Sequence, residues 1–123
     1  MVTEGTEQRL RVIVVEDDDD IASLLTDILE AEGYAPVAVS DSATLESELG
    51  SRPALVVLDL RLVRGGAANI MRSLRAREMA DVPILLLSAA NDLPDRAREL
   101  GVTRYLAKPF ELEDFLVIVR AMT

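Results

Sequence analysis

Short segments made almost entirely of apolar residues recur along the chain. They span residues 12–15, 36–39, 54–58, 83–87 and 105–107. A strand with one face in water alternates apolar and polar residues, whereas a strand covered on both faces is apolar throughout. The pattern therefore predicts five short strands buried inside the protein.

Between these segments, apolar residues recur every three or four positions, which is the spacing of an amphipathic helix. The clearest stripe is formed by Ile21, Leu24, Leu25, Ile28 and Leu29. The same spacing runs from Leu112 to Val119, and weaker helices are predicted over 42–49, 67–79 and 94–100. Strands that alternate with helices pair in parallel through right-handed crossovers. The predicted fold class is therefore α/β, a doubly wound parallel sheet of five strands with five helices.

Residues that commonly begin and end helices flank the helical segments. Glycine readily adopts the left-handed conformation that follows many helices, and the expected positions are Gly33, Gly50 and Gly101. Short polar side chains cap the first turn of a helix. The expected caps are Asp19 or Asp20 for the first helix and Ser40 or Ser42 for the second.

Composition removes several classes of function. The 123 residues fit one domain, which we place at 11–123 after a flexible tail at 1–10. The absence of Cys and His excludes thiolate and imidazole metal sites and serine triads. A net charge of −9 opposes binding to nucleic acid or to an anionic membrane. No segment has the pattern of a membrane span or a signal peptide, so we expect a cytoplasmic protein.

Polar side chains follow four of the predicted strands. Glu16 and Asp17 come directly after the first strand, Asp59 after the third, Ser88 after the fourth and Lys108 after the fifth. Ligands of open parallel sheets bind beyond the carboxyl ends of the strands, so these groups are expected to form one site. The aspartates that continue the run after Asp17 are expected mainly to cap the following helix.

The groups at this edge indicate phosphoryl chemistry. Three carboxylates that converge repel one another and need a cation. Because every donor is an oxygen, that cation should be Mg²⁺, with Mn²⁺ as a substitute. Mg²⁺ commonly binds carboxylates together with a phosphate, which Lys108 and Ser88 could also contact. A carboxylate can itself be the nucleophile that receives the phosphoryl group.

Four segments together resemble the receiver domain of two-component response regulators. They are RVIVVEDDDDI, ALVVLDLRL, PILLLSAA and YLAKPF, in the order expected for that family, and the resemblance covers the chain from about Arg11 to Met122. It implies a flavodoxin-like sheet with the strand order 2-1-3-4-5. It also implies a domain that catalyses its own phosphorylation and dephosphorylation and is not a turnover enzyme.

The resemblance implies a role for each residue at the site. Asp59 would be the phosphoacceptor, taking its phosphoryl group from a phosphohistidine on a sensor histidine kinase or a phosphotransfer protein. Glu16, Asp17 and Asp59, with the backbone carbonyl of Arg61, would hold the metal. Switching would fall to Ser88, which turns toward the phosphoryl group, to Lys108, which pairs with it, and to Tyr105, which turns inward.

The implied response is a change in the surface formed by the fourth helix, the fifth strand and the fifth helix. A downstream effector protein or an output domain outside this chain would read that change, and a homodimer is possible. Val63 and Ala67 depart from the residues usual in the family, and the stretch from Ser88 to Lys108 is about two residues short. A phosphorylation-independent interaction module is therefore the alternative to a working receiver.

Two enzyme classes with related folds fit the sequence less well. A flavodoxin-like electron carrier needs a phosphate-binding loop rich in Ser, Thr and Gly after its first strand, where this chain has five acids. An aspartate-nucleophile phosphatase usually has a second Asp two residues after its nucleophile, where this chain has Arg61.

Overall fold

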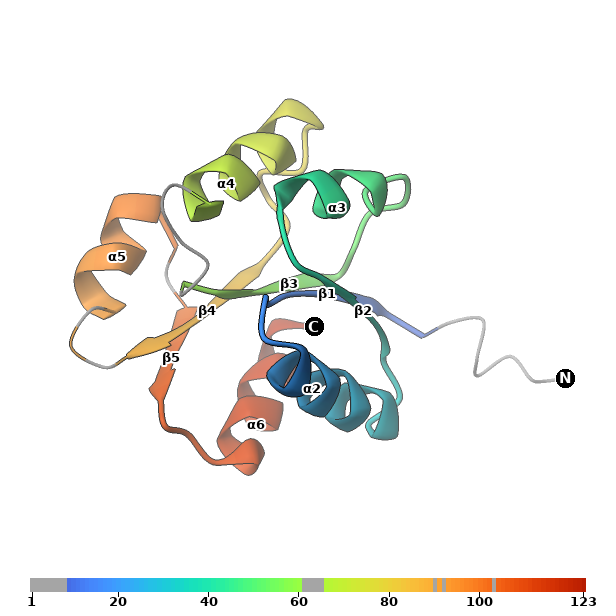
Figure 1. Cartoon of the computed structure of the whole chain (residues 1–123), viewed down its shortest axis with the longest axis vertical. Helices are drawn as coiled ribbons and strands as arrows, with labels where there is room; N and C mark the ends of the chain where they lie inside the picture. Colours follow the sequence, from blue (N-terminus) through green and yellow to red (C-terminus); the bar gives the residue numbers. More distant parts are fainter. Residues whose placement is uncertain (1–8, 61–65, 90, 92, 103) are drawn as a thin grey trace, which may run out of the picture.

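The computed structural model describes residues 9–60, 66–89, 91, 93–102 and 104–123 (Figure 1). Its strands are β1 (Arg11–Val15), β2 (Ala35–Val39), β3 (Leu55–Asp59), β4 (Ile84–Ala89) and β5 (Arg104–Lys108). They form one parallel sheet in the order β2-β1-β3-β4-β5. Both the parallel sheet and the strand order implied by the family resemblance are confirmed.

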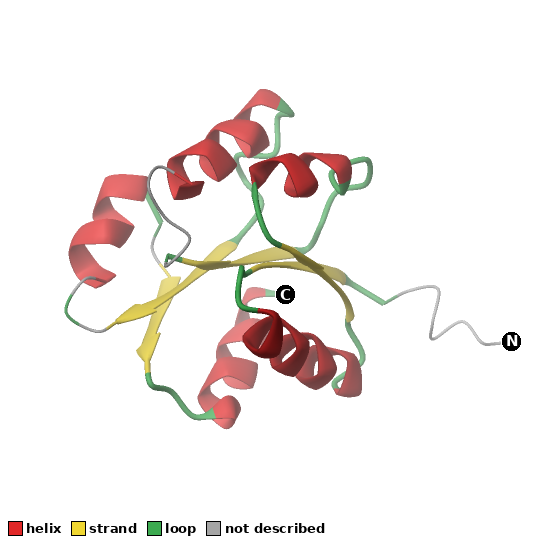
Figure 2. Cartoon of the chain, in the orientation of Figure 1, coloured by secondary structure: helices red, strands yellow, loops and turns green. Residues whose placement is uncertain are grey.

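Helices cover both faces of this sheet (Figure 2). They are α2 (Asp19–Ala31), α3 (Ser42–Ser47), α4 (Gly66–Ala76), α5 (Leu93–Leu100) and α6 (Leu112–Met122). Helices α2 and α6 lie on one face, and α3, α4 and α5 lie on the other (Figure 1). The five-helix prediction is confirmed, although α3 and α4 each end two or three residues before the predicted boundary. No helix in the described part of the chain combines the length and hydropathy needed to cross a membrane.

The central strands separate two hydrophobic clusters. In β1, Ile13 and Val15 face the cluster under α3, α4 and α5, whereas Val12 and Val14 face the cluster under α2 and α6. All four side chains are fully buried, as the continuous apolar pattern predicts. The prediction of full burial is wrong for β2 and β5, where most residues are half-buried or exposed. These two strands are the edges of the sheet and lack a neighbour on one side.

The helix caps lie close to the predicted residues but do not coincide with them. The Asp18 side chain accepts a hydrogen bond of 3.1 Å from the Ile21 amide and caps α2. The Asp41 side chain accepts one of 2.8 Å from the Thr44 amide and caps α3. The predictions of Asp19 or Asp20, and of Ser40 or Ser42, are therefore wrong. Among neighbouring polar residues, the cap is the one whose backbone is extended, and both Asp18 and Asp41 have that conformation.

Two of the three predicted glycines adopt the left-handed conformation. Gly33 after α2 has a φ of 97° and Gly101 after α5 has a φ of 72°. Gly50 does not have a positive φ, because α3 already ends at Ser47 and Gly50 lies beyond its last turn.

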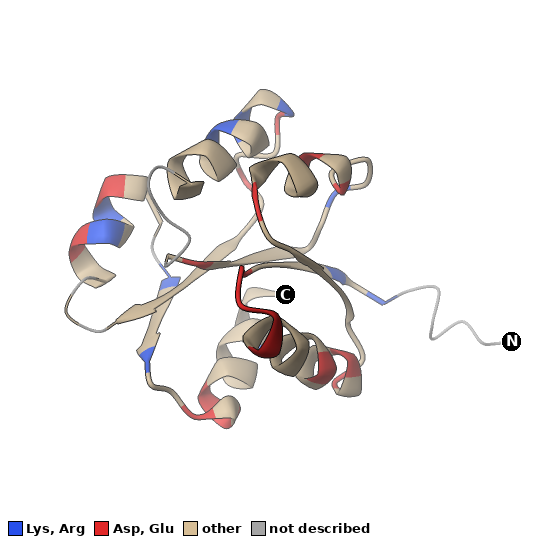
Figure 3. Cartoon of the chain, in the orientation of Figure 1, with Lys and Arg blue, Asp and Glu red and all other residues tan. Residues whose placement is uncertain are grey.

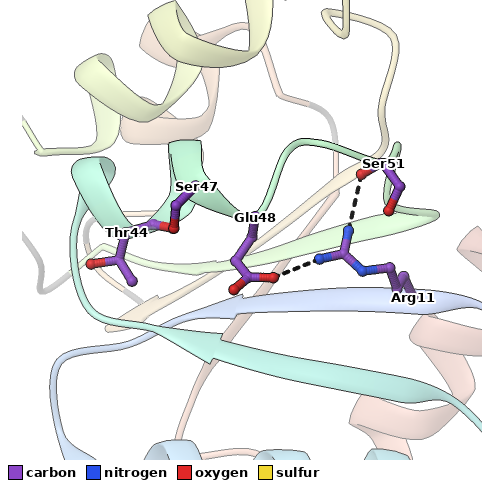
Figure 4. A network of polar contacts seen from close by, with 5 residues as sticks. All are labelled: Arg11, Thr44, Ser47, Glu48 and Ser51. Atoms are coloured by element: carbon purple, nitrogen blue, oxygen red, sulfur yellow. Dashed lines mark hydrogen bonds and ion pairs between the residues drawn. The ribbon is translucent and has the colours of Figure 1, made fainter.

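A polar network joins the start of the sheet to the end of α3 (Figure 4). Arg11, the first residue of β1, donates hydrogen bonds to the Ser51 carbonyl at 3.0 Å and to Glu48 Oε1 at 2.8 Å. This network lies at the amino end of β1, so it leaves the carboxyl edge of the sheet free for other chemistry.

Candidate functional site

The carboxyl edge of the sheet brings together residues from four separate segments. Glu16 follows β1, Asp59 is the last residue of β3, Ser88 lies near the end of β4, and Lys108 ends β5. The register pairs Asp59 with Leu87, and Ala89 with Lys108. Parallel pairing therefore places these residues at the same edge of the sheet, although more than 90 residues separate the first from the last.

Asp59 and Lys108 form an ion pair at the centre of this edge. Lys108 Nζ donates a hydrogen bond of 2.5 Å to Asp59 Oδ2. Asp59 is only 1% exposed, whereas the Lys108 side chain is 25% exposed. Since β4 lies between β3 and β5, the lysine side chain reaches across the end of β4. A charge-assisted bond of this kind holds the aspartate oxygen in one orientation.

Glu16 is the second buried carboxylate. It is 2% exposed, and its Oε2 accepts a hydrogen bond of 3.0 Å from the Asp18 amide. The pKa of Glu16 is raised from 4.5 to about 7, mainly by burial, and a side-chain hydrogen bond with Asp59 and the charge of Asp59 contribute to this rise. Two carboxylates this close repel each other when both are ionised, so the pair is stabilised by a shared proton or by a bound cation.

Asp18 was not among the predicted site residues, yet it positions Glu16. Its backbone amide holds the Glu16 carboxylate, while its side chain caps α2. One residue thus fixes both the start of the helix and the orientation of a buried acid. The run of aspartates after Asp17 indicated that Asp18 has a capping role, but not its second role, which depends on the turn between β1 and α2.

The other predicted residues lie in different environments. Asp17 is exposed beside the buried Glu16, and Ser88 is 7% exposed on β4. Tyr105 is 42% exposed on the edge strand β5. Arg61 and Val63 lie outside the described residues. Within the described ranges, no group of three or more acidic side chains is already arranged to hold a metal.

The donor set nonetheless suits a hard cation. Glu16 and Asp59 contribute carboxylate oxygens only, and both are buried next to each other. A divalent cation would favour the ionised form of Glu16, whose pKa burial raises. Lys108 supplies one positive charge at the same place and so neutralises only part of this pair.

Comparison with known proteins identifies the family. Residues 12–120 match the family model for the response regulator receiver domain. The chain belongs to this family. A similar curated protein is the DNA-binding response regulator MtrA of Mycolicibacterium smegmatis, 37% identical over 116 residues, which cover 92% of this chain and 50% of that protein. The transcriptional regulatory protein PrrA of Mycobacterium bovis is 35% identical over 115 residues, which cover 91% of this chain and 49% of that protein. This receiver domain thus spans about half the length of these curated relatives.

Solved structures agree on the fold of the receiver domain. The chemotaxis response regulator CheY4 of Vibrio cholerae aligns with a TM-score of 0.81 over 94% of this chain and 100% of that one, at 20% identity. The receiver domain of sensor histidine kinase PA1611 from Pseudomonas aeruginosa aligns with a TM-score of 0.79 at 26% identity. The alignment covers 93% of this chain and 97% of that one. That structure holds a magnesium ion in its active-site cleft.

Proposed function

We propose that this receiver domain accepts a phosphoryl group on Asp59 within a two-component phosphorelay. The observation that carries the proposal is the Lys108–Asp59 contact of 2.5 Å beside the buried Glu16. A carboxylate oxygen of Asp59 would attack the phosphorus of a phosphohistidine on a sensor histidine kinase or a phosphotransfer protein. The new P–O bond forms as the P–N bond breaks, and the departing imidazole takes up a proton.

Mg²⁺ is the cofactor that we propose for this transfer, with Mn²⁺ as a substitute. Glu16, Asp17 and Asp59 would hold it, together with the backbone carbonyl of Arg61. The ion would neutralise charge on the transferring phosphoryl oxygens. The oxygen-only donor set and the magnesium ion in the related PA1611 receiver support this choice.

Lys108 and Ser88 then give the domain its response. Phosphorylation adds a charge of about −1.5 to −2 and three acceptor oxygens. We propose that the Lys108 ammonium transfers its hydrogen bond from Asp59 to the phosphoryl group, and that the Ser88 hydroxyl donates to a second oxygen. Motion of Ser88 would displace the chain leading into α5, and Tyr105 would turn inward on β5. The surface of α5, β5 and α6 would therefore differ between the two states.

The partners follow from this switching surface. We propose that a downstream effector or an output domain reads it. We also propose that the chain can form a homodimer and that the domain works in the cytoplasm without contacting nucleic acid or a membrane. The relatives named as DNA-binding and transcriptional regulators are about twice as long as this chain, which is consistent with a separate output domain in those proteins.

The mass of the intact protein after incubation with acetyl phosphate tests the proposal. We expect one phosphoryl adduct that requires Mg²⁺ and that is absent from Asp59→Asn. Asp27→Asn, a change of an exposed acid on α2, is the matched control and should be labelled like the wild type. Labelling of Asp59→Asn at the wild-type rate would exclude Asp59 as the acceptor. Failure of the wild type to form an adduct with either metal would favour a phosphorylation-independent interaction module.

A further inference from the structure

Helix α4 and the turn after it form a locally basic surface on an acidic protein. Arg72 and Arg75 are exposed on the helix, and the exposed Arg77 follows it. No acid occurs between residues 66 and 77, and the first one afterwards is Glu78. Figure 3 shows α4 with basic positions only, whereas α2 and α5 carry acids. The contrast is marked because the chain has a net charge of −9.

Ion pairing separates these arginines from most other basic residues. The basic residues with an acidic partner are Arg11, Arg52, Arg96, Arg98, Lys108 and Arg120. Among the residues that the structure describes, no ion pair includes Arg72, Arg75 or Arg77. Arg72 donates a hydrogen bond to the neutral side chain of Asn69.

Stabilisation of the helix explains only part of this arrangement. A cation in the last turn interacts favourably with the helix dipole, which accounts for Arg75 and in part for Arg77. Arg72 lies in the middle of α4, where that effect is weak. Residues three apart are neighbours on a helix surface, so Arg72 and Arg75 repel each other at a cost to the isolated helix.

Grooves border the basic helix on both sides. The groove toward α3 has a volume of about 400 Å³ and is lined by Ser42, Glu46, Asn69, Arg72, Ser73 and Ala76. Glu46 accepts a hydrogen bond of 2.7 Å from the Ser73 hydroxyl. The second groove has a volume of about 410 Å³, and Met71 of α4 lines it together with apolar residues such as Val82 and Val102. Cationic, hydrogen-bonding and apolar groups therefore border α4, together with one acid in each groove: Glu46 in the first and Asp81, which is paired with Arg52, in the second.

We propose that this surface, which we call the α4 basic surface and define as Arg72, Arg75, Arg77 and the two flanking grooves, binds an acidic segment of a partner protein. Carboxylates of the segment would pair with the arginines, and its apolar side chains would enter the groove beside Met71. Nucleic acid fits this surface less well, because binding a phosphate backbone requires many cationic contacts and this surface is defined by three arginines. The α4 basic surface does not include Asp59, so the inference is independent of the proposed phosphorylation.

A fluorescent peptide of alternating Asp, Glu and Leu residues provides a direct test. It is titrated into the full chain and followed by fluorescence anisotropy at low ionic strength. We expect saturable binding that weakens about fivefold in R72A/R75A, since two exposed charge pairs are lost. The matched control is R96A/R98A, which makes the same change of composition on α5, where both arginines already have acidic partners. R72K/R75K keeps the charges and should retain most of the binding.

Chemical-shift mapping locates the bound peptide. We expect the peptide to change the backbone amide chemical shifts of residues 69–77 and of Ser42, and to change those of α5 little. Equal affinity of R72A/R75A and the wild type, or shifts that are not centred on α4, would overturn the proposal. Tighter binding of a duplex DNA than of the peptide would also overturn it and assign the surface to nucleic acid.

Discussion

Glu16→Gln should change the pH dependence of folding stability in a defined direction. The folded protein raises the pKa of Glu16 from 4.5 to about 7, first through burial and then through the neighbouring Asp59. The neutral acid is therefore the form that the fold favours. The folding stability that comes from this preference is fully present below pH 4.5 and is lost as the pH rises through about 7.

The size of the effect follows from the shift. A difference of about 2.5 pKa units corresponds to about 3 kcal/mol between the two protonation states. Glutamine has nearly the same shape, carries no charge, can accept from the Asp18 amide and can donate to Asp59. Above pH 8, without metal, Glu16→Gln should therefore be more stable than the wild type by up to about 3 kcal/mol, and near pH 4.5 the two should be similar.

Urea unfolding at several pH values between about 5 and 8 in the presence of EDTA measures this difference. Glu30→Gln, which changes an exposed acid on α2, is the matched control and should follow the wild type at every pH. The reasoning would be refuted if Glu16→Gln and the wild type lost stability in parallel as the pH rises.

Three further predictions concern the same edge of the sheet. Mg²⁺ should stabilise the wild type against urea at pH 8 by mass action and should have little effect on Glu16→Gln, because the variant lacks one charged ligand. Lys108→Ala should destabilise the domain by about 2 kcal/mol, since it leaves the buried Asp59 charge without its cation. Lys108→Ala should still take up a phosphoryl group from acetyl phosphate, but the chemical shifts of Ser88 and Tyr105 should no longer change on phosphorylation. Asp18→Ala removes the side-chain cap of α2 and should lower the free energy of unfolding by about 1 kcal/mol. Asp19 does not make this capping bond, so Asp19→Ala should lower the free energy of unfolding by under about 0.5 kcal/mol in the same urea assay.

Each of these three predictions has an outcome that would contradict it. Equal stabilisation of wild type and Glu16→Gln by Mg²⁺ would place the ion elsewhere. A phosphorylation-dependent shift of Tyr105 that persists in Lys108→Ala would remove the lysine from the switch. Equal losses in Asp18→Ala and Asp19→Ala would mean that the side-chain cap contributes no stability of its own.

The central part of the fold could be predicted from the sequence because burial on both faces leaves a continuous apolar pattern. Val12 to Val15 is such a stretch, and it forms the middle of the sheet. The edge strands could not be distinguished in this way, because β2 is nearly as apolar as β1 although it has a neighbour on only one side. The strand order came from the family resemblance, since the sequence pattern does not encode which strands are adjacent.

The site was predictable as a set of strand-end residues, but not in its internal geometry. Glu16 and Asp17 are adjacent acids that were both expected to help hold the metal, and the structure buries the first and exposes the second. The difference arises where the chain leaves β1: the Glu16 amide still bonds to the Val39 carbonyl, and its carboxylate turns back to the Asp18 amide. Such turns depend on backbone geometry that no local sequence pattern specifies.

The ion pair between β3 and β5 makes the edge strand dependent on chemistry in the core. Strand β5 has no fully buried residue and only one strand neighbour. Its last residue is tethered by charge to a buried aspartate two strands away. Amide hydrogen exchange in β5 should therefore report on the charge state of Asp59, because a change at that carboxylate alters the contact that holds the end of the strand.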